Sequence, residues 1–292
     1  MNIQKSFQGE RHTGTLYLVA TPIGNLEDMT MRAIRTLNEV DIIAAEDTRN
    51  TRKLLTHFEI KTRLVSYHEH NKEASGPELI KLLLEGTNIA LVSDAGMPAI
   101  SDPGADIARL AIEQNIAVVP IPGANAALSS LIVSGLYTDR FTFIGFLPRD
   151  KKHAQRMLEQ YAASRETLIF YESPHRIRKT LATLLDSWGN RRASAARELT
   201  KRHEEMIRGR LTELIEHFEQ HQPLGEFCII IEGLDDEGAD QLKQAANSWW
   251  QELSLEEHVS HYEATMSRKA AMKQVALDRG ISKRDIYNEI NR

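Results

Sequence analysis

The chain has 292 residues, of which 41% are hydrophobic and 26% are charged, and its formal net charge at pH 7 is −5. At about 150 residues per domain this length predicts two domains, and the composition excludes intrinsic disorder, collagen and coiled coil. A single cysteine excludes an intramolecular disulfide framework and a cysteine-rich zinc site, and it favours a reducing compartment.

From residue 15 onward, short apolar runs alternate with segments of helical periodicity. The runs are residues 16–20, 42–45, 64–67, 89–92 and 118–121. Between them, residues 31–40 and 78–84 have apolar positions three and four apart, which indicates amphipathic helices. Repeated β-α units predict an α/β domain over residues 13–134, with a parallel sheet covered by helices on both faces. The first run is too short for a signal peptide or a membrane span, so we expect a cytoplasmic protein with no membrane contact.

A second series of apolar runs follows residues 135–139, which we interpret as a linker. The expected strands are residues 141–146, 167–171, 193–196, about 205–211, and 227–231, with helices near 152–163 and 174–186. This order predicts a second α/β domain at 139–233. An acidic turn then precedes a helical tail at 240–292.

The net charge conceals an asymmetry along the chain. Residues 149–220 carry 15 Lys and Arg against 11 Asp and Glu (+4), and residues 261–292 carry 7 against 4 (+3), whereas residues 221–260 carry 1 against 9 (−8). Local charge sets the field that a polyanion meets, so the basic segments are compatible with an RNA partner. Solvated helix faces of mixed sign are the alternative interpretation.

The tail has the spacing of a helix-turn-helix, with Val275 and Ala276, then Gly280, then Ile286. Its basic residues are candidates for RNA phosphate contacts: Arg268, Lys269, Lys273, Lys283 and Arg284. A plain helical hairpin is the alternative.

Three loops that follow expected strands are rich in proline and glycine: residues 21–26, 93–104 and 120–126. In a doubly wound sheet, ligands bind beyond the carboxyl ends of the strands, where these loops lie. Common signatures of nucleotide and metal sites are absent, including Gly-x-Gly-x-x-Gly, the Walker motif and His-Glu-x-x-His. His68 and His70 lack a nearby third ligand, so we expect no metal.

Eight segments of the chain resemble the tetrapyrrole methylase superfamily. They are residues 19–28, 45–49, 91–104, 120–126, 145–149, 170–176, 197–201 and 225–227. Among its members the likeness is to enzymes that 2′-O-methylate a cytidine in the decoding region of 16S rRNA. The resemblance implies S-adenosylmethionine (SAM) as cofactor, small-subunit rRNA or the 30S subunit as partner, and a homodimer.

The resemblance also assigns residues to the cofactor. These are Pro22, Gly24, Asp94, Ala95, Gly96, Ile100, Ser101, Ala124, Asn125, Ala126, Phe170 and Tyr171. A tetrapyrrole C-methyltransferase with the same cofactor slot is the alternative function. It is disfavoured because Ser93-Asp94-Ala95-Gly96 stands where tetrapyrrole enzymes usually have Gly-Asp-Pro.

A ribose hydroxyl is a poor nucleophile, so a proton acceptor near the methyl donor would assist its reaction. Glu46 and Asp47 directly follow the second expected strand and are candidates for this role, although Asp47 could instead cap the next helix. Lys201 could lower the pKa of the hydroxyl, and Arg197 could hold an RNA phosphate.

Overall fold

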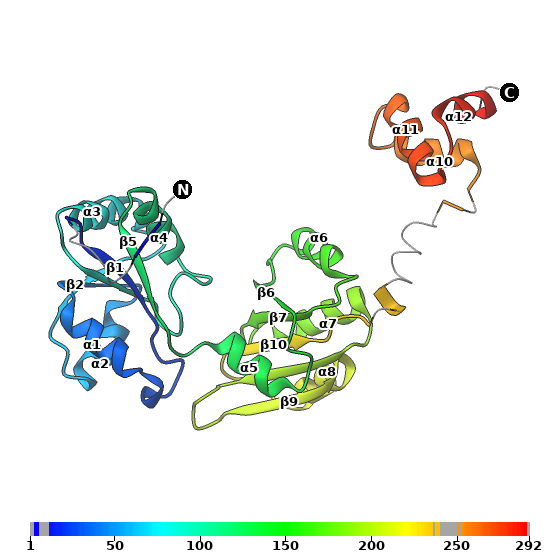
Figure 1. Ribbon diagram of the computed structural model, residues 1–292. Coiled ribbons are helices and arrows are strands. Elements are labelled where there is room, and N and C mark those ends of the chain that lie inside the picture. The colour runs from blue at the N-terminus through cyan, green and yellow to red at the C-terminus, as the bar shows by residue number, and fades with distance from the viewer. Residues whose placement is uncertain (1–2, 6–11, 236, 240–249, 252, 291–292) are drawn as a thin grey trace. The chain divides into compact units, whose positions relative to one another are not determined.

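The computed structural model describes residues 3–5, 12–235, 237–239, 250–251 and 253–290 (Figure 1). The chain forms two compact units, one of residues 1–155 and 167–232, the other of residues 156–166 and 233–292. The first unit contains both sheets. The assignment of three separate domains stays a prediction, and its residues 240–249, 252 and 291–292 lie outside the described part.

The first sheet is fully parallel, as predicted. Its strands are β1 (Thr15–Val19), β2 (Ile42–Ala45), β3 (Arg63–Ser66), β4 (Ile89–Val92) and β5 (Ala117–Ile121). They are arranged in the order β3-β2-β4-β1-β5. Every residue of β2 and β4 is buried, because helices cover both faces of the sheet.

Helices lie on both sides of this sheet (Figure 1), and two apolar clusters attach them to it. On one face, Leu37 of α1 (Met31–Glu39) and Leu55 of α2 (Thr48–His57) pack with Ile43 of β2. On the other face, α3 (Lys72–Leu84) and α4 (Gly104–Glu113) pack against Leu91 of β4. Side chains of a strand alternate between faces, so both layers draw on the same central strands.

The second sheet is mixed. Its strands are β6 (Phe141–Phe146), β7 (Thr167–Glu172), β8 (Arg192–Arg197), β9 (Glu205–Arg210) and β10 (Phe227–Ile231), in the order β6-β7-β10-β8-β9. Only β6 and β7 pair in parallel, whereas the other three pairs are antiparallel. The predicted strands are therefore confirmed.

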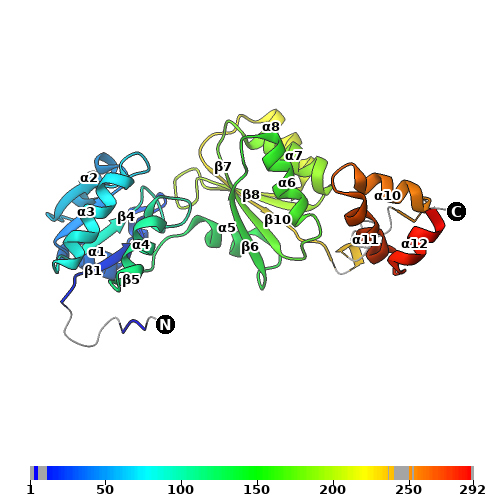
Figure 2. The ribbon, with the colours of Figure 1, turned by 90° about the horizontal axis from the view of Figure 1, so that it is seen from above.

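Helices also cover the second sheet. On one face, Ala127 and Leu131 of α5 (Ala126–Ser134) pack with Ile169 of β7. Phe170, the next residue of β7, contacts Trp188 at the end of α7 (Ile177–Trp188). Figure 2 shows α7 beside α8 (Leu211–Gln220). Another helix, α6 (Lys151–Tyr161), follows β6 and precedes β7 along the chain.

Between residues 253 and 290, which the structure describes, the C-terminal unit has three helices with a small core of their own. These are α10 (Leu255–Glu263), α11 (Arg268–Arg279) and α12 (Lys283–Ile290), and buried Val259, Val275 and Ile286 pack between them. The chain turns from α11 into α12 at Gly280, whose φ is +65°. The sequence predicted the two helices on either side of this glycine, α11 and α12. The helix α10, which packs with them, was not predicted separately.

Candidate functional site

The loops that follow β1 and β4 are joined to each other at the carboxyl end of the first sheet. Thr21 and Gly96 form an isolated antiparallel bridge, with the Thr21 N–H donating to the Gly96 carbonyl at 2.9 Å and the reverse bond at 3.0 Å. The Thr21 hydroxyl also donates to the Ser93 carbonyl at 3.1 Å. The two loops therefore form one wall, and residues on it face alternate sides.

A pocket lies on one side of this wall. Seven of the predicted site residues line it: Ala95, Gly96, Ile100, Asn125, Ala126, Tyr171 and Lys201. The other lining residues are Ile23, Met97, Phe146, Glu172, Ser173, Ala196, Glu198, Leu199, Glu226, Phe227 and Cys228. Apolar surface with a few polar groups suits an organic cofactor. Among the lining residues, the Glu226 carboxylate complements the positive sulfonium and amino groups of SAM, and Lys201 complements its carboxylate, so the residues present fit the cofactor.

The loop that carries Ile100 is held in a strained conformation by Asp102. Ala99 and Ser101 have φ angles of +69° and +61°, in the left-handed region that side chains with a Cβ rarely adopt. The Asp102 carboxylate accepts hydrogen bonds from the N–H groups of Ala99 at 2.8 Å and Gly104 at 2.7 Å. Burial raises the pKa of Asp102. Ser101 itself is exposed and does not line the pocket.

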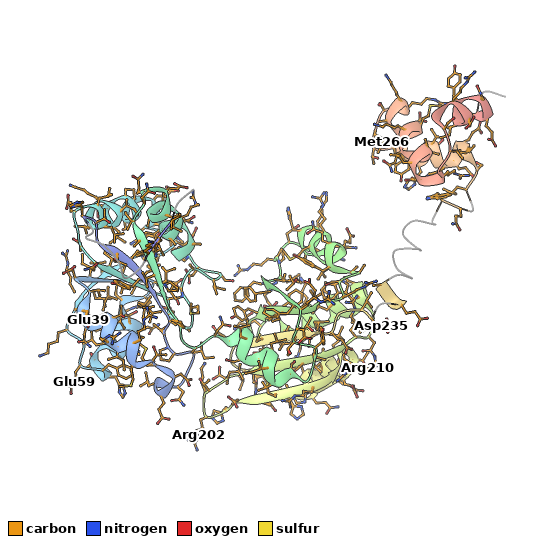
Figure 3. All side chains as sticks on the ribbon, viewed as in Figure 1. Glu39, Glu59, Arg202, Arg210, Asp235 and Met266 are labelled. Carbon is orange, nitrogen blue, oxygen red and sulfur yellow. The ribbon has the colours of Figure 1, made fainter. Side chains whose placement is uncertain are left out.

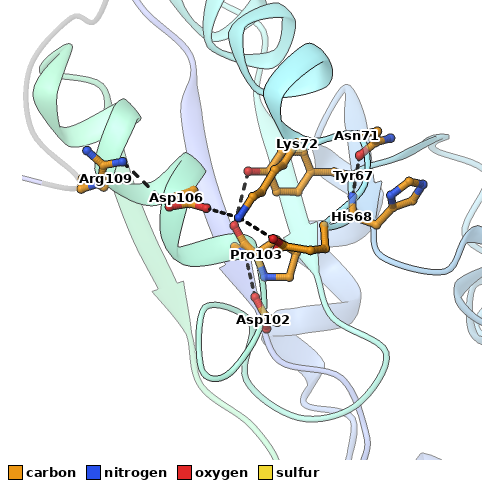
Figure 4. A network of polar contacts seen from close by, with 10 residues as sticks. Tyr67, His68, Asn71, Lys72, Asp102, Pro103, Asp106 and Arg109 are labelled. Carbon is orange, nitrogen blue, oxygen red and sulfur yellow. Dashed lines mark hydrogen bonds and ion pairs between the residues drawn. The ribbon is translucent and has the colours of Figure 1, made fainter. Parts of the chain in front are cut away.

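A polar network supports the other end of this loop (Figure 4). The Lys72 ammonium lies 2.8 Å from the Glu69 carboxylate and 2.9 Å from that of Asp106, and Asp106 lies 3.9 Å from Arg109. The Tyr67 hydroxyl donates to the Pro103 carbonyl at 3.3 Å. The network attaches the segment after β3 to the start of α4, which fixes the end of the pocket loop.

Tyr171 forms part of the wall contributed by the second sheet. Its ring packs edge-on against Phe143 and Phe146, with centroids 5.0 and 5.8 Å away, and its hydroxyl oxygen accepts a bond from the Ala127 N–H at 3.2 Å. Burial raises its pKa to about 12, so the hydroxyl stays protonated at neutral pH. The neighbouring Phe170 points to the opposite face and is fully buried against Trp188, so we remove it from the cofactor contacts.

The loop between β8 and β9 approaches the loop after β1. The Asn25 N–H donates to the Thr200 hydroxyl oxygen at 3.1 Å, and Lys201 forms an ion pair with Glu198 at 2.9 Å. A Cβ on Gly24 would lie 2.3 Å from the Lys201 Cγ, so a larger residue there would displace the Lys201 side chain. The next residue of this loop, Arg202, is exposed (Figure 3).

Three predicted cofactor residues lie on the other side of the wall. Pro22, Gly24 and Asp94 line a second depression together with residues of α2, including Lys53. Ala124 lines neither depression, but its carbonyl oxygen would lie 3.5 Å from a Cβ built on Gly96. The predicted residues are thus close in space but divided between two surfaces.

Glu46 and Asp47 have different surroundings. Burial raises the pKa of Glu46, and the nearby carboxylates of Asp94 and Asp102 raise it further. The Asp47 carboxylate instead accepts the Arg49 N–H at 2.8 Å as the N-cap of α2 and contacts the Arg49 guanidinium at 3.2 Å, which lowers the pKa of Asp47. Neither Glu46 nor Asp47 lines the first pocket.

The raised pKa of Glu46 has a consequence for stability. A carboxyl with a raised pKa stabilises the folded state fully below its ordinary value of 4.5, and this contribution is lost as the pH rises through the raised pKa. Glu46→Gln cannot ionise. The variant should therefore gain melting temperature relative to the wild type between pH 4 and pH 8. An equal difference in melting temperature at both pH values would exclude this linkage.

The predicted RNA-contacting residues lie outside the pocket. Arg197 is paired with Glu205 at 2.5 Å across the β8–β9 ladder. In the C-terminal unit Arg268 pairs with Glu263 at 3.4 Å, and Lys269, Lys273 and Arg284 are exposed. Lys283 begins α12, and its side chain is outside the described part.

Several pocket residues were not singled out in the sequence. Glu198, Leu199, Glu226 and Cys228 come from the antiparallel half of the second sheet, where strand order cannot be deduced from an alternating pattern alone. Cys228 is a buried thiol, and burial raises its pKa to about 12.

Two kinds of site are absent from the part of the chain that the structure describes. Its residues contain no group of three or more His, Cys, Asp or Glu side chains that could hold a metal ion. No helix among them is both long and apolar enough to span a bilayer.

Comparison with solved structures identifies the fold. A diphthine synthase matches with a TM-score of 0.60 at 15% identity, covering 78% of this chain and 94% of that one. A uroporphyrin-III C-methyltransferase from Thermus thermophilus matches with a TM-score of 0.52 at 20% identity, covering 79% and 98%.

Sequence comparison identifies the family. The model of the tetrapyrrole (corrin/porphyrin) methylases matches residues 15–215. A protein named ribosomal RNA small subunit methyltransferase I from Halalkalibacterium halodurans is 57% identical over 99% of this chain and 98% of its own length. Its namesake from Bacillus subtilis is 51% identical over 98% and 97%. The chain therefore belongs to the tetrapyrrole methylase family, within it to the ribosomal RNA small subunit methyltransferase I group, and it is a methyltransferase that uses SAM.

Proposed function

We propose that the protein transfers the methyl group of SAM to the ribose 2′-hydroxyl of a cytidine in the decoding region of 16S rRNA, in the cytoplasm. The observation that carries this proposal is the pocket at the joined loops of the first sheet, in a chain whose relatives at 57% and 51% identity are named for the small-subunit rRNA.

The pocket residues have distinct proposed roles. When bound, SAM supplies an electrophilic methyl group. Gly96 and Ala126 leave room for the cofactor, Tyr171 closes one side, and Lys201 attracts its carboxylate. Alignment of the reacting atoms accounts for most of the rate in such a transfer, so a rigid wall matters more than a reactive side chain. The bridge between Thr21 and Gly96 provides that rigidity.

We propose that the Glu46 carboxylate accepts the proton of the ribose hydroxyl. The pKa of Glu46 is raised toward neutral pH, and a general base is most efficient when its pKa lies near the pH at which the enzyme works. Asp47 is already engaged with Arg49 and with the first turn of α2, which makes Glu46 the preferred acceptor. SAM, held by the pocket residues, would supply the methyl group to the hydroxyl oxygen, and Glu46 would accept the hydroxyl proton.

Mass spectrometry of rRNA nucleosides tests the proposal. A strain that lacks the gene should lose 2′-O-methylcytidine from the decoding region of 16S rRNA, and the restored gene should return it. Unchanged 2′-O-methylcytidine together with altered tetrapyrroles would favour the alternative, a tetrapyrrole C-methyltransferase.

We also propose that the basic residues of the C-terminal unit dock RNA. The variant Lys269→Ala/Lys273→Ala/Arg284→Ala removes three exposed cations from helices whose core they do not enter. If each contacts a phosphate of single-stranded RNA, the slope of log affinity against log salt should fall by about 2. Fluorescence anisotropy with a labelled RNA oligonucleotide measures this slope.

SAM affinity is the control for this variant, and it should not change, because the pocket lies in the other compact unit. A joint loss of SAM affinity and melting temperature would contradict the docking role. Truncation at residue 261 is a poorer test, since α10 would be cut through while Val259 supplies part of the three-helix core.

We further propose a homodimer through α5. Leu128, Ile132 and Val133 of this helix are exposed, and Ile132 retains 74% of its surface. An apolar row on a helix is typical of an interface between subunits. Sedimentation of the wild type should give the mass of two chains, and sedimentation of Ile132→Glu should give the mass of one chain. A monomeric wild type would exclude the dimer.

A further inference from the structure

The exposed face of α2 carries a group of cations that the family assignment does not explain. Arg49, Arg52, Lys53 and Thr56 are all exposed and lie three, four and seven positions from the first of them, so they share one face of the helix. With Thr48 they line a shallow depression of their own. Every side chain in this depression carries either a positive charge or a hydroxyl group, and no carboxylate contributes to it.

Two of these cations differ from those on neighbouring helices. Arg35 on α1 and Lys81 on α3 each pair with a glutamate four positions later, and Arg109 on α4 pairs with Glu113. Neither Arg52 nor Lys53 has a carboxylate within 4.0 Å among the described residues. Arg49 is paired with Asp47, so the positive potential of this face depends mainly on Arg52 and Lys53.

The cationic face continues toward the candidate reaction centre. Lys53 lines both the depression on α2 and the second depression, which contains Pro22, Gly24 and Asp94. Asp94 acts electrostatically on Glu46 and accepts the Asp47 N–H at 3.1 Å. Ser93 and Asp94 of the second depression directly precede Ala95 and Gly96 of the SAM pocket, so the two depressions lie next to each other. A continuous surface therefore leads from α2 to the edge of the cofactor pocket.

We propose that this α2 face, made of Thr48, Arg49, Arg52, Lys53 and Thr56, binds the phosphodiester backbone of the substrate RNA next to the methylated nucleotide. The inference deepens the proposed function and rests on it. Arginine, lysine and threonine side chains are the usual partners of phosphate oxygens, and contacts of this kind position a strand without reading its sequence. Residues 1–148 carry 13 Lys and Arg against 17 Asp and Glu, so this attraction is local.

The double variant Arg52→Ala/Lys53→Ala tests the proposal. The probe is a fluorescein-labelled single-stranded RNA of about 12 nucleotides and mixed sequence, titrated by anisotropy over a series of salt concentrations. Loss of two phosphate contacts should lower the slope of log affinity against log salt by about 1.4, which corresponds to about 25-fold weaker binding at about 0.1 M salt.

The matched control is Arg35→Ala/Lys81→Ala, which removes one exposed cation each from α1 and α3, both outside the depression on α2. It should keep the wild-type slope. An equal loss in both variants, an unchanged slope in the α2 variant, or no salt-dependent binding by the wild type would each overturn the proposal.

Methyl transfer separates failure of this inference from failure of the proposed function. With small-subunit RNA as substrate, the α2 variant should have a raised KM and the wild-type SAM affinity. An active wild type and an α2 variant with unchanged KM would reject the α2 face alone. An inactive wild type whose RNA binding still depends on Arg52 and Lys53 would reject the rRNA reaction and retain the surface.

Discussion

Gly96→Leu is expected to weaken SAM binding by about 100-fold or more, which corresponds to about 2.7 kcal/mol. Gly96 lines the pocket with a φ of +78°, and a Cβ there would already lie 3.4 Å from Ile23 and 3.5 Å from the Ala124 carbonyl oxygen. The remaining atoms of leucine would occupy space that the cofactor needs. Isothermal titration calorimetry with SAM measures the effect.

Gly135→Leu is the matched control, because Gly135 has the same φ of +78° but a Cβ there would meet no atom within 4 Å. Both variants should lose stability by about 1–2 kcal/mol from the left-handed backbone. Only Gly96→Leu should lose SAM. Wild-type affinity in Gly96→Leu, or equal losses in both variants, would place the cofactor elsewhere.

Glu46→Gln is expected to lower kcat by about 10² to 10⁴-fold, the usual contribution of a general base. Glutamine keeps the size of the side chain and removes only its ability to accept the proton. SAM affinity should be unchanged, because Glu46 does not line the pocket. Steady-state kinetics with saturating SAM and small-subunit RNA measures kcat, and a wild-type value would remove Glu46 from the mechanism.

The pH profile provides an independent check on Glu46. The negative charge of Asp94 raises the pKa of Glu46, so Asp94→Asn should lower that pKa. The base would then stay ionised to lower pH, and the acidic limb of kcat/KM should move to lower pH. The asparagine oxygen can still accept the Asp47 N–H, so the loop should keep its shape. An acidic limb at the same pH would mean that another group titrates.

The sequence predicted the first sheet well because its signals are local. Strands such as β2 and β4 are buried on both faces and read as uninterrupted apolar runs. The start of α3 was missed: it begins at Lys72 rather than near residue 78, since Gly76 and Pro77 resemble a turn. The contacts of Lys72 with Glu69 and Asp106 hold this first turn, and they join residues up to 34 positions apart.

The site was only partly predictable, because some of its residues are placed by contacts between distant parts of the chain. Gly96, Asn125 and Ala126 were found because they follow parallel strands, whose carboxyl ends meet at one edge of a sheet. The side of the wall on which Asp94 lies depends on the bridge between Thr21 and Gly96, which no local pattern encodes. Phe170 was misassigned relative to Tyr171 because consecutive strand residues face opposite sides.

The most direct test of the account is methyl transfer by the purified protein. Small-subunit rRNA incubated with isotopically labelled SAM and the wild type should yield labelled 2′-O-methylcytidine after digestion, as measured by mass spectrometry. Gly135→Leu should retain this product, and Gly96→Leu should lose it. Label in any other nucleoside, or no label with the wild type while SAM binds, would contradict a ribose methyltransferase that uses this pocket.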